Sequence, residues 1–219
     1  MNRRLLAKVV IDSLASRRLL DHPFYVRWSR GDVSVDELRT YAEQYRHFEA
    51  QLPGVLRTVA AAGGAARTAV ENNLADEAGG AVTHVALFDG FATALGAQAN
   101  VAPTPAMANL LATYDRLAAA GPIAGISAVL AYETQSADIA ASKVAGLREH
   151  YGMDGHDVAF WDVHAGLDHD HAAWLVDGLV ALDAEQADVS TPLVEAAQAW
   201  WEFLDEREAA APLVQGSAA

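Results

Sequence analysis

The sequence predicts an all-α fold in one domain, and three observations support this prediction. Apolar residues recur at helical spacing through most of the 219 residues, and no segment alternates apolar and polar residues as a strand does. Helix-start and helix-stop signals follow one another along the chain, without an internal repeat or a linker. We expect a bundle of seven or eight helices over residues 1–208, followed by a flexible tail over residues 209–219.

Four of these helices are expected in the N-terminal half. Residues 2–20 carry apolar positions at helical spacing and end before the "DHP" segment. Residues 34–52 open with a serine-to-glutamate capping box, and we expect this helix to end at Pro53. The stretch "AARTAVENNLADEAGG" ends in two glycines, which stop a helix, and a new helix is expected directly after them, over residues 81–96.

The C-terminal half is expected to hold four more helices. Residues 104–121 start with a threonine cap that is followed by proline in the first helical position. The longest helix is expected over about residues 123–150, and another covers residues 155–182. Thr191 and Pro192 are expected to begin the last helix, because threonine is a good cap and proline suits the first turn.

The composition excludes several classes of protein. The formal net charge of −14 opposes binding to nucleic acid or to an anionic membrane, both of which need basic surfaces. The chain has no cysteine, so disulfides, thiolate metal sites and cysteine nucleophiles are excluded. No apolar run reaches the roughly 18 residues of a membrane span, and the N-terminus lacks the features of a signal peptide. We expect a cytoplasmic protein that binds neither nucleic acid nor membranes.

The stretch "WDVHAGLDHDHAAW", residues 161–174, is rich in potential metal ligands. At about 100° per residue, His164, Asp168 and His171 fall within about 60° of one another on a helical wheel. The remaining histidine and the aspartate beside it point to other sides of the helix. One face of this helix therefore presents two imidazoles and one carboxylate.

Two other regions offer partners for this face. Glu133 is the sole acid in an apolar run, and burying a lone carboxylate is unfavourable unless it is paired or bound to a metal. Glu77 and His84 are seven residues apart across the two glycines, about two helical turns. Three carboxylates and three imidazoles suit two iron or manganese ions with open positions for dioxygen. Taken singly, each histidine is more often a surface or hydrogen-bonded residue, Glu77 a helix-end charge and Asp168 a cap, so the spacing alone leaves both interpretations open.

The order of these residues resembles the pattern of a known superfamily. The motif E-x6-H, a helical Tyr-Glu pair and the motif H-x3-D-x2-H are similar to those of the haem-oxygenase-like di-metal oxidases and oxygenases. The resemblance implies a compact helical bundle without haem that binds two metal ions, Fe/Fe or Fe/Mn, and uses dioxygen and an external reductant. It also implies the ligand set, which in chain order is Glu77, His84, Glu133, His164, Asp168 and His171.

Two longer stretches resemble one branch of this superfamily, named after the Chlamydia protein associating with death domains. They are "HPFYVRWSRGDVSVDELRTYAEQY" and "AYETQSADIAASKVAGLREHYG", and the similarity spans roughly residues 20–180. The branch is linked to folate metabolism, and the resemblance implies that para-aminobenzoate is made from a tyrosine of the protein itself, with a lysine as the amine donor. The matching positions are Tyr25, Tyr132 and Lys143, and we expect Tyr25 rather than Tyr132 to supply the carbon.

The residues themselves are compatible with that role. Lys143 is the only lysine after Lys8, and lysine, unlike arginine, offers a nucleophilic primary amine. Tyr132 and Lys143 share a helix face but lie about 16 Å apart along the axis, so they cannot touch directly. The alternatives are that Tyr25 only packs in a local aromatic cluster and that Lys143 is a solvated helix charge.

Three classes of function remain open from the sequence. The first is the self-sacrificing oxygenase, and the second is a conventional di-metal oxygenase that acts on an external small amino acid or fatty acid by N-oxygenation, desaturation or carbon–carbon cleavage. The third is an adaptor that binds helical proteins through an exposed apolar face, for which "VEAAQAWWEFL" is the only candidate. Trp200 and Trp201 point about 100° apart on a helix, so one can pack inward while the other is expected in a homodimer contact.

Overall fold

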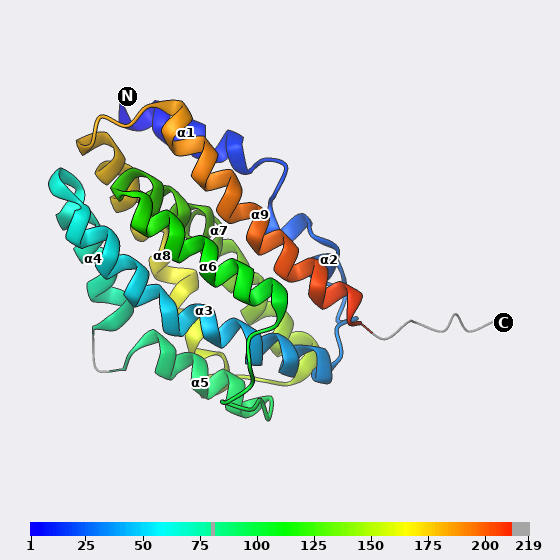
Figure 1. Cartoon of the computed structure of the whole chain (residues 1–219). Coiled ribbons are helices and arrows are strands. Elements are labelled where there is room, and N and C mark those ends of the chain that lie inside the picture. The colour runs from blue at the N-terminus through cyan, green and yellow to red at the C-terminus, as the bar shows by residue number, and fades with distance from the viewer. Residues whose placement is uncertain (80–81, 212–219) are drawn as a thin grey trace.

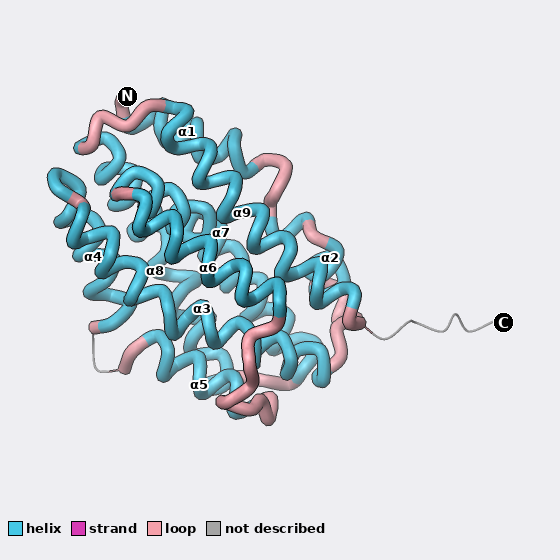
Figure 2. Tube along the Cα trace, viewed as in Figure 1, coloured by secondary structure: helices cyan, strands magenta, loops and turns pink. Residues whose placement is uncertain are grey.

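The structure, a computed structural model, describes residues 1–79 and 82–211, except for the side chains of residues 167–170. Within these residues there is no strand (Figure 2), and nine α-helices follow one another along the chain. Their bounds are α1 (Arg3–Leu14), α2 (Pro23–Trp28), α3 (Val35–Ala62), α4 (Arg67–Ala78), α5 (His84–Ala94), α6 (Pro105–Ala120), α7 (Pro122–Tyr151), α8 (Ala159–Ala181) and α9 (Gln186–Ala209). The predicted all-α bundle is confirmed, and the described part holds one helix more than expected because the short α2 forms a separate element.

Local signals in the sequence set several of the helix ends. At the start of α3, the side chain of Ser34 accepts from the backbone N–H of Glu37, whose carboxylate accepts from the N–H of Ser34 in return. α7 ends at Gly152, which has a φ of 65°, a left-handed conformation that glycine adopts without strain. α1 is shorter than predicted and ends at Leu14, because no side chain between Leu14 and Leu19 is buried.

Two prolines lie inside helices, where the sequence predicts a helix end and a helix start. α3 continues through Pro53 because Val55 and later apolar residues of the same helix are buried in the core. α9 begins at Gln186, upstream of Pro192, because Val189 in this first segment is already fully buried. Each proline removes one backbone hydrogen bond, and burial of the flanking apolar side chains compensates for that loss.

α7 forms the centre of the bundle. It packs against α1, α3, α6, α8 and α9, and in Figure 1 it passes behind α6 and α9. Residues 126–131 of this helix have no exposed surface at all. Buried positions of a helix are expected to be apolar, so the buried Glu133 and Lys143 of α7 are exceptions that need a physical reason.

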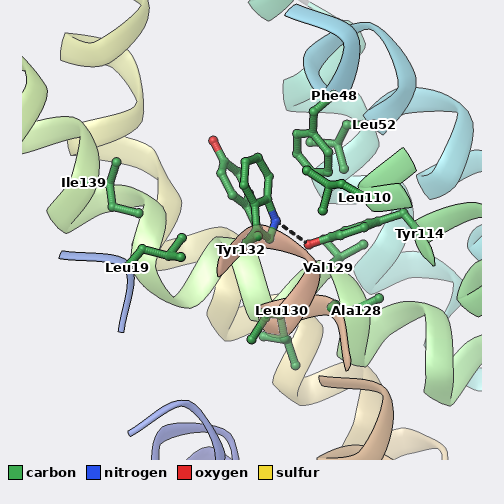
Figure 3. Close-up of a cluster of buried hydrophobic side chains, with 14 of the residues drawn as sticks. Leu19, Phe48, Leu52, Leu110, Tyr114, Ala128, Val129, Leu130, Tyr132 and Ile139 are labelled. Carbon is green, nitrogen blue, oxygen red and sulfur yellow. Dashed lines mark hydrogen bonds between the residues drawn. The ribbon is translucent and has the colours of Figure 1, made fainter. Parts of the chain in front are cut away.

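An aromatic cluster lies between α3, α6, α7 and α9. Phe48, Tyr114 and Tyr132 are part of it (Figure 3). The ring of Trp200 stacks on Tyr132 with centroids 5.4 Å apart, and its Nε1 donates to the hydroxyl of Tyr114 at 2.9 Å, the dashed bond in Figure 3. Trp201 is only partly buried, so the expected division between an inward and an outward tryptophan is observed, while its use in a homodimer stays a prediction.

The boundary between the domain and the expected tail lies close to the end of the described residues. α9 continues to Ala209, and the part of the tail from residue 212 onward lies outside the described residues, so its flexibility stays a prediction. Among the described helices, none is both long and apolar enough to cross a membrane.

Gly146 of α7 allows Trp28 of α2 to pack against the helix backbone. A Cβ at position 146 would lie 2.6 Å from Cζ2 of Trp28, so Gly146→Ala forces the two helices or the ring apart. We expect this variant to lose about 1–3 kcal/mol in the free energy of unfolding, as for other overpacked cores. Gly54→Ala is the control, because nothing lies within 4 Å of the added Cβ in α3, and it should be neutral or stabilising. Urea denaturation measures both changes, and equal stabilities would contradict the tight α2–α7 contact.

Candidate functional site

Five of the six predicted metal ligands are buried together inside the bundle. They come from α4, α5, α7 and α8, and none is more than 5 % exposed: Glu77, His84, Glu133, His164 and His171. The sixth, Asp168, belongs to α8, but its side chain lies outside the described residues, so its role as a ligand stays a prediction. Two carboxylates buried with three imidazoles are unfavourable unless positive charge balances them.

The five side chains form two triads that share one carboxylate. Glu77, His84 and His164 form the first triad and Glu77, Glu133 and His171 the second, with the potential ligand atoms of each triad within 4.8 Å of one another. The two oxygens of Glu77 face different histidines. Its Oε2 lies 2.8 Å from Nδ1 of His84, and its Oε1 lies 3.8 Å from Nδ1 of His171. The arrangement therefore offers two adjacent groups of ligands with a carboxylate that can bridge them.

Local structure holds the histidines of the first triad in the form that binds metals. His84 is the first residue of α5, and Thr83 caps this helix by accepting the backbone N–H of Ala86. In α8, Nδ1 of His164 donates to the carbonyl oxygen of Phe160 at 2.8 Å, which leaves the lone pair on Nε2. Burial lowers the pKa of His164 to about 4, so its imidazole is neutral near pH 7 and able to bind a metal.

The two carboxylates differ in their electrostatics. Burial raises the pKa of Glu77, but the hydrogen bond with His84 and the electrostatic interactions with the surrounding histidines outweigh it, so its pKa lies below the usual range. Burial also raises the pKa of Glu133, and its interactions with His171 and Asn73 offset this rise only in part. The environment therefore favours the ionised form of Glu77 and disfavours that of Glu133, which a positive charge beside it would favour.

Two polar neighbours of this cluster are not predicted from the sequence. Oδ2 of Asp76 lies 3.2 Å from Nε2 of His171, which directs the Nδ1 of that ring toward Glu77 and Glu133. Asn73 lies with its Nδ2 3.5 Å from Oε1 of Glu133. Asn73 and Glu77 are four residues apart on α4, and this spacing is a signal that could have identified Asn73. No such spacing singles out Asp76.

Lys143 is fully buried in a cage of aromatic side chains. Its Nζ lies between 4.1 and 5.8 Å from five ring centroids, those of Phe24, Tyr25, Trp28, Tyr41 and Trp161. Among the described residues Nζ has no hydrogen-bond partner. Burial lowers the pKa of Lys143 well below that of a free lysine, which favours the neutral amine. The alternative of a solvated helix charge is therefore wrong.

A row of four tyrosines connects this lysine cage with the carboxylate–histidine cluster. The hydroxyls of Tyr25 and Tyr41 are 3.3 Å apart, and the rings of Tyr41 and Tyr45 stack with centroids 5.4 Å apart. The hydroxyls of Tyr45 and Tyr132 are 2.5 Å apart, and Tyr132 directly precedes Glu133. Tyr41 and Tyr45 are absent from the predicted site residues, although their spacing of four on an expected helix places them on one face.

Comparison with known proteins identifies the family. The profile of a family described as iron-containing redox enzymes matches residues 39–205. The chain belongs to this family. It is 36 % identical to the 4-aminobenzoate synthase of Nitrosomonas europaea, an alignment that covers 90 % of this chain and 89 % of the relative. It is 30 % identical to the 4-aminobenzoate synthase of Chlamydia trachomatis, over 88 % of this chain and 87 % of that relative.

Solved structures with low sequence identity share the fold. A CADD-like protein of Nostoc punctiforme has a TM-score of 0.76 at 22 % identity, and the match covers 93 % of this chain and 97 % of that protein. A TenA homologue of Pseudomonas syringae has a TM-score of 0.81 at 14 % identity, covering 95 % and 96 %. A domain of Shewanella denitrificans, described as having a haem-oxygenase-like fold, has a TM-score of 0.76 at 17 % identity, covering 95 % and 93 %. The haem-oxygenase-like bundle predicted from the sequence is confirmed.

Glu77→Ala should lower metal loading more than the removal of any other single ligand. Glu77 belongs to both triads, so its loss removes a ligand from two ions, whereas His84→Ala affects one. Elemental analysis after anaerobic iron loading measures the effect, and Glu71→Ala, an exposed carboxylate on the same helix, is the control. Equal losses in Glu77→Ala and His84→Ala would contradict the sharing of Glu77.

In the same assay, unchanged loading in Asp168→Ala would remove Asp168 from the ligand set.

Lys143→Met should stabilise the fold, because it replaces an unpaired buried amine by an apolar group. The expected gain near pH 7 is roughly 1–3 kcal/mol in the free energy of unfolding. The pKa of Lys143 is lowered in the folded state, so between that pKa and about pH 10.4 the unfolded chain binds more protons, and Lys143 makes wild-type stability rise with pH in this window. Denaturant titrations at several pH values should show this rise in the wild type and in Lys8→Met, whose lysine is exposed on α1. The same rise in Lys143→Met would contradict the assignment to Lys143.

Proposed function

We propose that the protein is a non-haem di-metal oxygenase that forms 4-aminobenzoate from one of its own tyrosines, with Lys143 as the amine donor. The observation that carries this proposal is the lysine cage, in which Nζ lies 5.0 Å from the ring centroid of Tyr25 and 4.1 Å from that of Tyr41. The curated relatives, which are named 4-aminobenzoate synthases, support the product. The family of iron-containing redox enzymes supports the class of reaction.

The carbon atoms of the product match those of a tyrosine side chain. 4-Aminobenzoate is a benzene ring with a carboxylate and, opposite to it, an amino group, and tyrosine carries Cβ and a hydroxyl at these two positions. Its formation from tyrosine breaks the Cα–Cβ bond, oxidises Cβ to a carboxylate and replaces the phenolic oxygen by nitrogen. Lys143 is the amine that lies beside the rings in the cage, and its Cε–Nζ bond breaks when the nitrogen is transferred. Each chain is therefore consumed by one product.

Burial makes Lys143 suitable as a nitrogen donor. An ammonium group has no lone pair, so a nucleophilic lysine must be neutral at the pH of the reaction. The aromatic rings around Nζ exclude water and lower the pKa of Lys143, which keeps the lone pair available. The same rings fix the amine beside the aromatic carbons that it must reach.

The buried carboxylate–histidine cluster fits two metal ions. Its mixed oxygen and nitrogen ligands, and the raised pKa of Glu133, match a site that a pair of divalent cations completes. The residues that would hold an Fe/Fe or Fe/Mn pair are Glu77, His84, Glu133, His164 and His171. The family resemblance adds Asp168 to them. When bound, the pair supplies the oxidising power of dioxygen, with electrons from an external reductant.

The tyrosine row offers a route between this cluster and the lysine cage. A tyrosine that loses an electron also gives up its hydroxyl proton, and hydroxyls in hydrogen-bonding contact can pass that proton on. Tyr132 and Tyr45 are in such contact at the cluster end, as are Tyr41 and Tyr25 at the cage end. Tyr132 lies about 16 Å from Lys143 along α7, so we assign it the role of a link rather than that of the carbon source. Tyr25 and Tyr41 both adjoin Lys143, and the family resemblance favours Tyr25.

A conventional oxygenase with an external substrate is the second candidate, because an apolar pocket lies near the cluster. The pocket has a volume of about 510 Å³ between α1, α7 and α8. Thr134 and Ala172 line it, and they are the chain neighbours of Glu133 and His171. A small amino acid or fatty acid chain would fit this volume.

Isotope labelling separates these functions. The reduced, metal-loaded protein, produced with ring-labelled tyrosine, should release labelled 4-aminobenzoate without added substrate, at most about one molecule per chain. Lys143→Arg should abolish the product, because arginine has no primary amine. Lys8→Arg is the matched control at an exposed site and should leave the yield unchanged. Mass spectrometry of the reacted protein should place the mass loss at Tyr25, or at Tyr41 if the second ring of the cage is the source.

Three outcomes would contradict the proposal. Product formation by both Lys143→Arg and Tyr25→Phe would exclude the assigned donor and source. Multiple turnovers that need an added amino acid or fatty acid would identify a conventional oxygenase. An absence of both product and dioxygen consumption in fully metal-loaded protein would favour the adaptor.

A further inference from the structure

His22 is a fully buried polar residue that the proposed reaction does not use. It directly precedes α2 and lies three residues before Tyr25. Nδ1 of its ring accepts the backbone N–H of Phe24 at 3.1 Å, and Nε2 lies 3.1 Å from Oδ1 of Asp205 on α9. Because a backbone N–H can only donate, Nδ1 is unprotonated, and Nε2 carries the proton and donates to Asp205. Both ring nitrogens therefore have a defined role.

The short helix α2 depends on this arrangement at its N-terminal end. A helix of six residues is not stable by itself, and its first N–H groups lack partners within the helix. The ring of His22 satisfies one of them, as serine or aspartate does at other helix starts. The same ring lies edge-on against Trp201, with centroids 4.7 Å apart. One side chain thus caps α2 and joins it to α9.

α2 carries three of the five rings around Lys143, those of Phe24, Tyr25 and Trp28. The C-terminal end of α2 has anchors of its own, because Nε1 of Trp28 donates to the carbonyl of Ser142 at 3.1 Å. At the N-terminal end, the side chain that joins α2 to a neighbouring helix by hydrogen bonding is that of His22. Loss of the cap therefore frees the end of α2 on which Tyr25 depends.

We propose that His22 is a positioning residue that caps α2 through Nδ1 and so holds the ring of Tyr25 against the amine of Lys143. Its expected effect on product yield rests on the proposed function, whereas its effect on the cage does not. His22 touches neither Lys143 nor the carboxylate–histidine cluster in any contact described above, so it acts through the helix that it caps.

The cap requires a neutral imidazole. Protonation would place a hydrogen on Nδ1, where it meets the N–H of Phe24 and breaks the bond. The charged groups near the ring are Asp205 and Glu208 of α9 and Arg17, which lies over Trp201. Burial lowers the pKa of His22 more than the two carboxylates raise it, so the cap persists at neutral pH and is lost only as the pH falls through this lowered pKa.

Two variants separate capping from the loss of the ring. His22→Asn keeps a hydrogen-bond acceptor close to the position of Nδ1, and asparagine is a favoured N-cap. His22→Gln keeps a polar group close to the position of Nε2 but offers no cap. Both lose the contact with Trp201, so a difference between them reports the cap. His47→Ala is the control, because Nε2 of His47 is hydrogen-bonded to the carbonyl oxygen of Val101, which is far from α2 in the chain.

Hydrogen exchange and acylation measure the cage in the full chain without relying on turnover. In His22→Gln the amides of residues 24–28 should exchange roughly fivefold faster, the change that corresponds to about 1 kcal/mol for a lost cap. Lys143 should become acylated faster relative to Lys8, the only other lysine and an exposed internal reference. His22→Asn should stay closer to the wild type than His22→Gln does, and His47→Ala should match the wild type in both readouts. As the pH falls through the lowered pKa of His22, the wild type should approach His22→Gln, and His22→Asn should not.

Equal exchange and acylation in His22→Asn and His22→Gln would overturn the inference. So would a full yield of 4-aminobenzoate from metal-loaded His22→Gln. If the wild type released no product while the two variants still differed in exchange and acylation, the capping role would stand and the proposed function would fail.

Discussion

The structure depends on the burial of the middle of α7, residues 125–133, and of the face that carries Lys143. Where this helix is surrounded by its neighbours, water cannot stabilise a charge, so each ionisable side chain buried there must be balanced or neutral. Glu133 and Lys143, ten residues apart on this helix, meet that requirement in opposite ways. The carboxylate lies among histidines and a second carboxylate in a cluster that could hold a metal ion, whereas the lysine lies among aromatic rings, where burial favours the neutral amine.

The two buried groups are separated by about 15 Å along the axis of α7. α3 runs beside this helix and places Tyr41 and Tyr45, one turn apart, in the interval. Tyr132 closes the row at the cluster end and Tyr25 closes it at the cage end. Tyr132 and Lys143 are too far apart for direct contact. Side chains from helices near the N-terminus fill the space between them.

The sequence predicts the bundle and most of the buried ligands because both leave a local pattern. His164 and His171 fall on one face of one helix, and Glu133 is the lone acid of an apolar run, so each is visible within a few turns. Pro53 and Pro192 led to wrong helix ends in the prediction, because no local pattern shows whether a helix continues through a proline. Burial of the neighbouring side chains decides this. α2 is too short for its periodicity to be recognised.

Contacts between distant segments are the part that the sequence does not reveal. His22 and Asp205 are 183 residues apart in the sequence, and His171 and Asp76 of α4 are 95 residues apart. No spacing rule connects such pairs, because they depend on how the helices pack. The tyrosine row is an intermediate case, since the spacing of Tyr41 and Tyr45 is visible but their neighbours are not.

Burial also bears on why a protein would use its own side chains as reactants. An enzyme with an external substrate needs an open path and pays translational and rotational entropy at each binding event. Lys143 is 0 % exposed and Tyr25 is 4 % exposed, so folding itself places the amine beside the ring and no binding step is needed. The geometry is then only as accurate as the helices that carry the two residues, because no incoming substrate can adjust to a misplaced group. In such a site, the interactions that fix the start of a six-residue helix are as important to the chemistry as the residues that react.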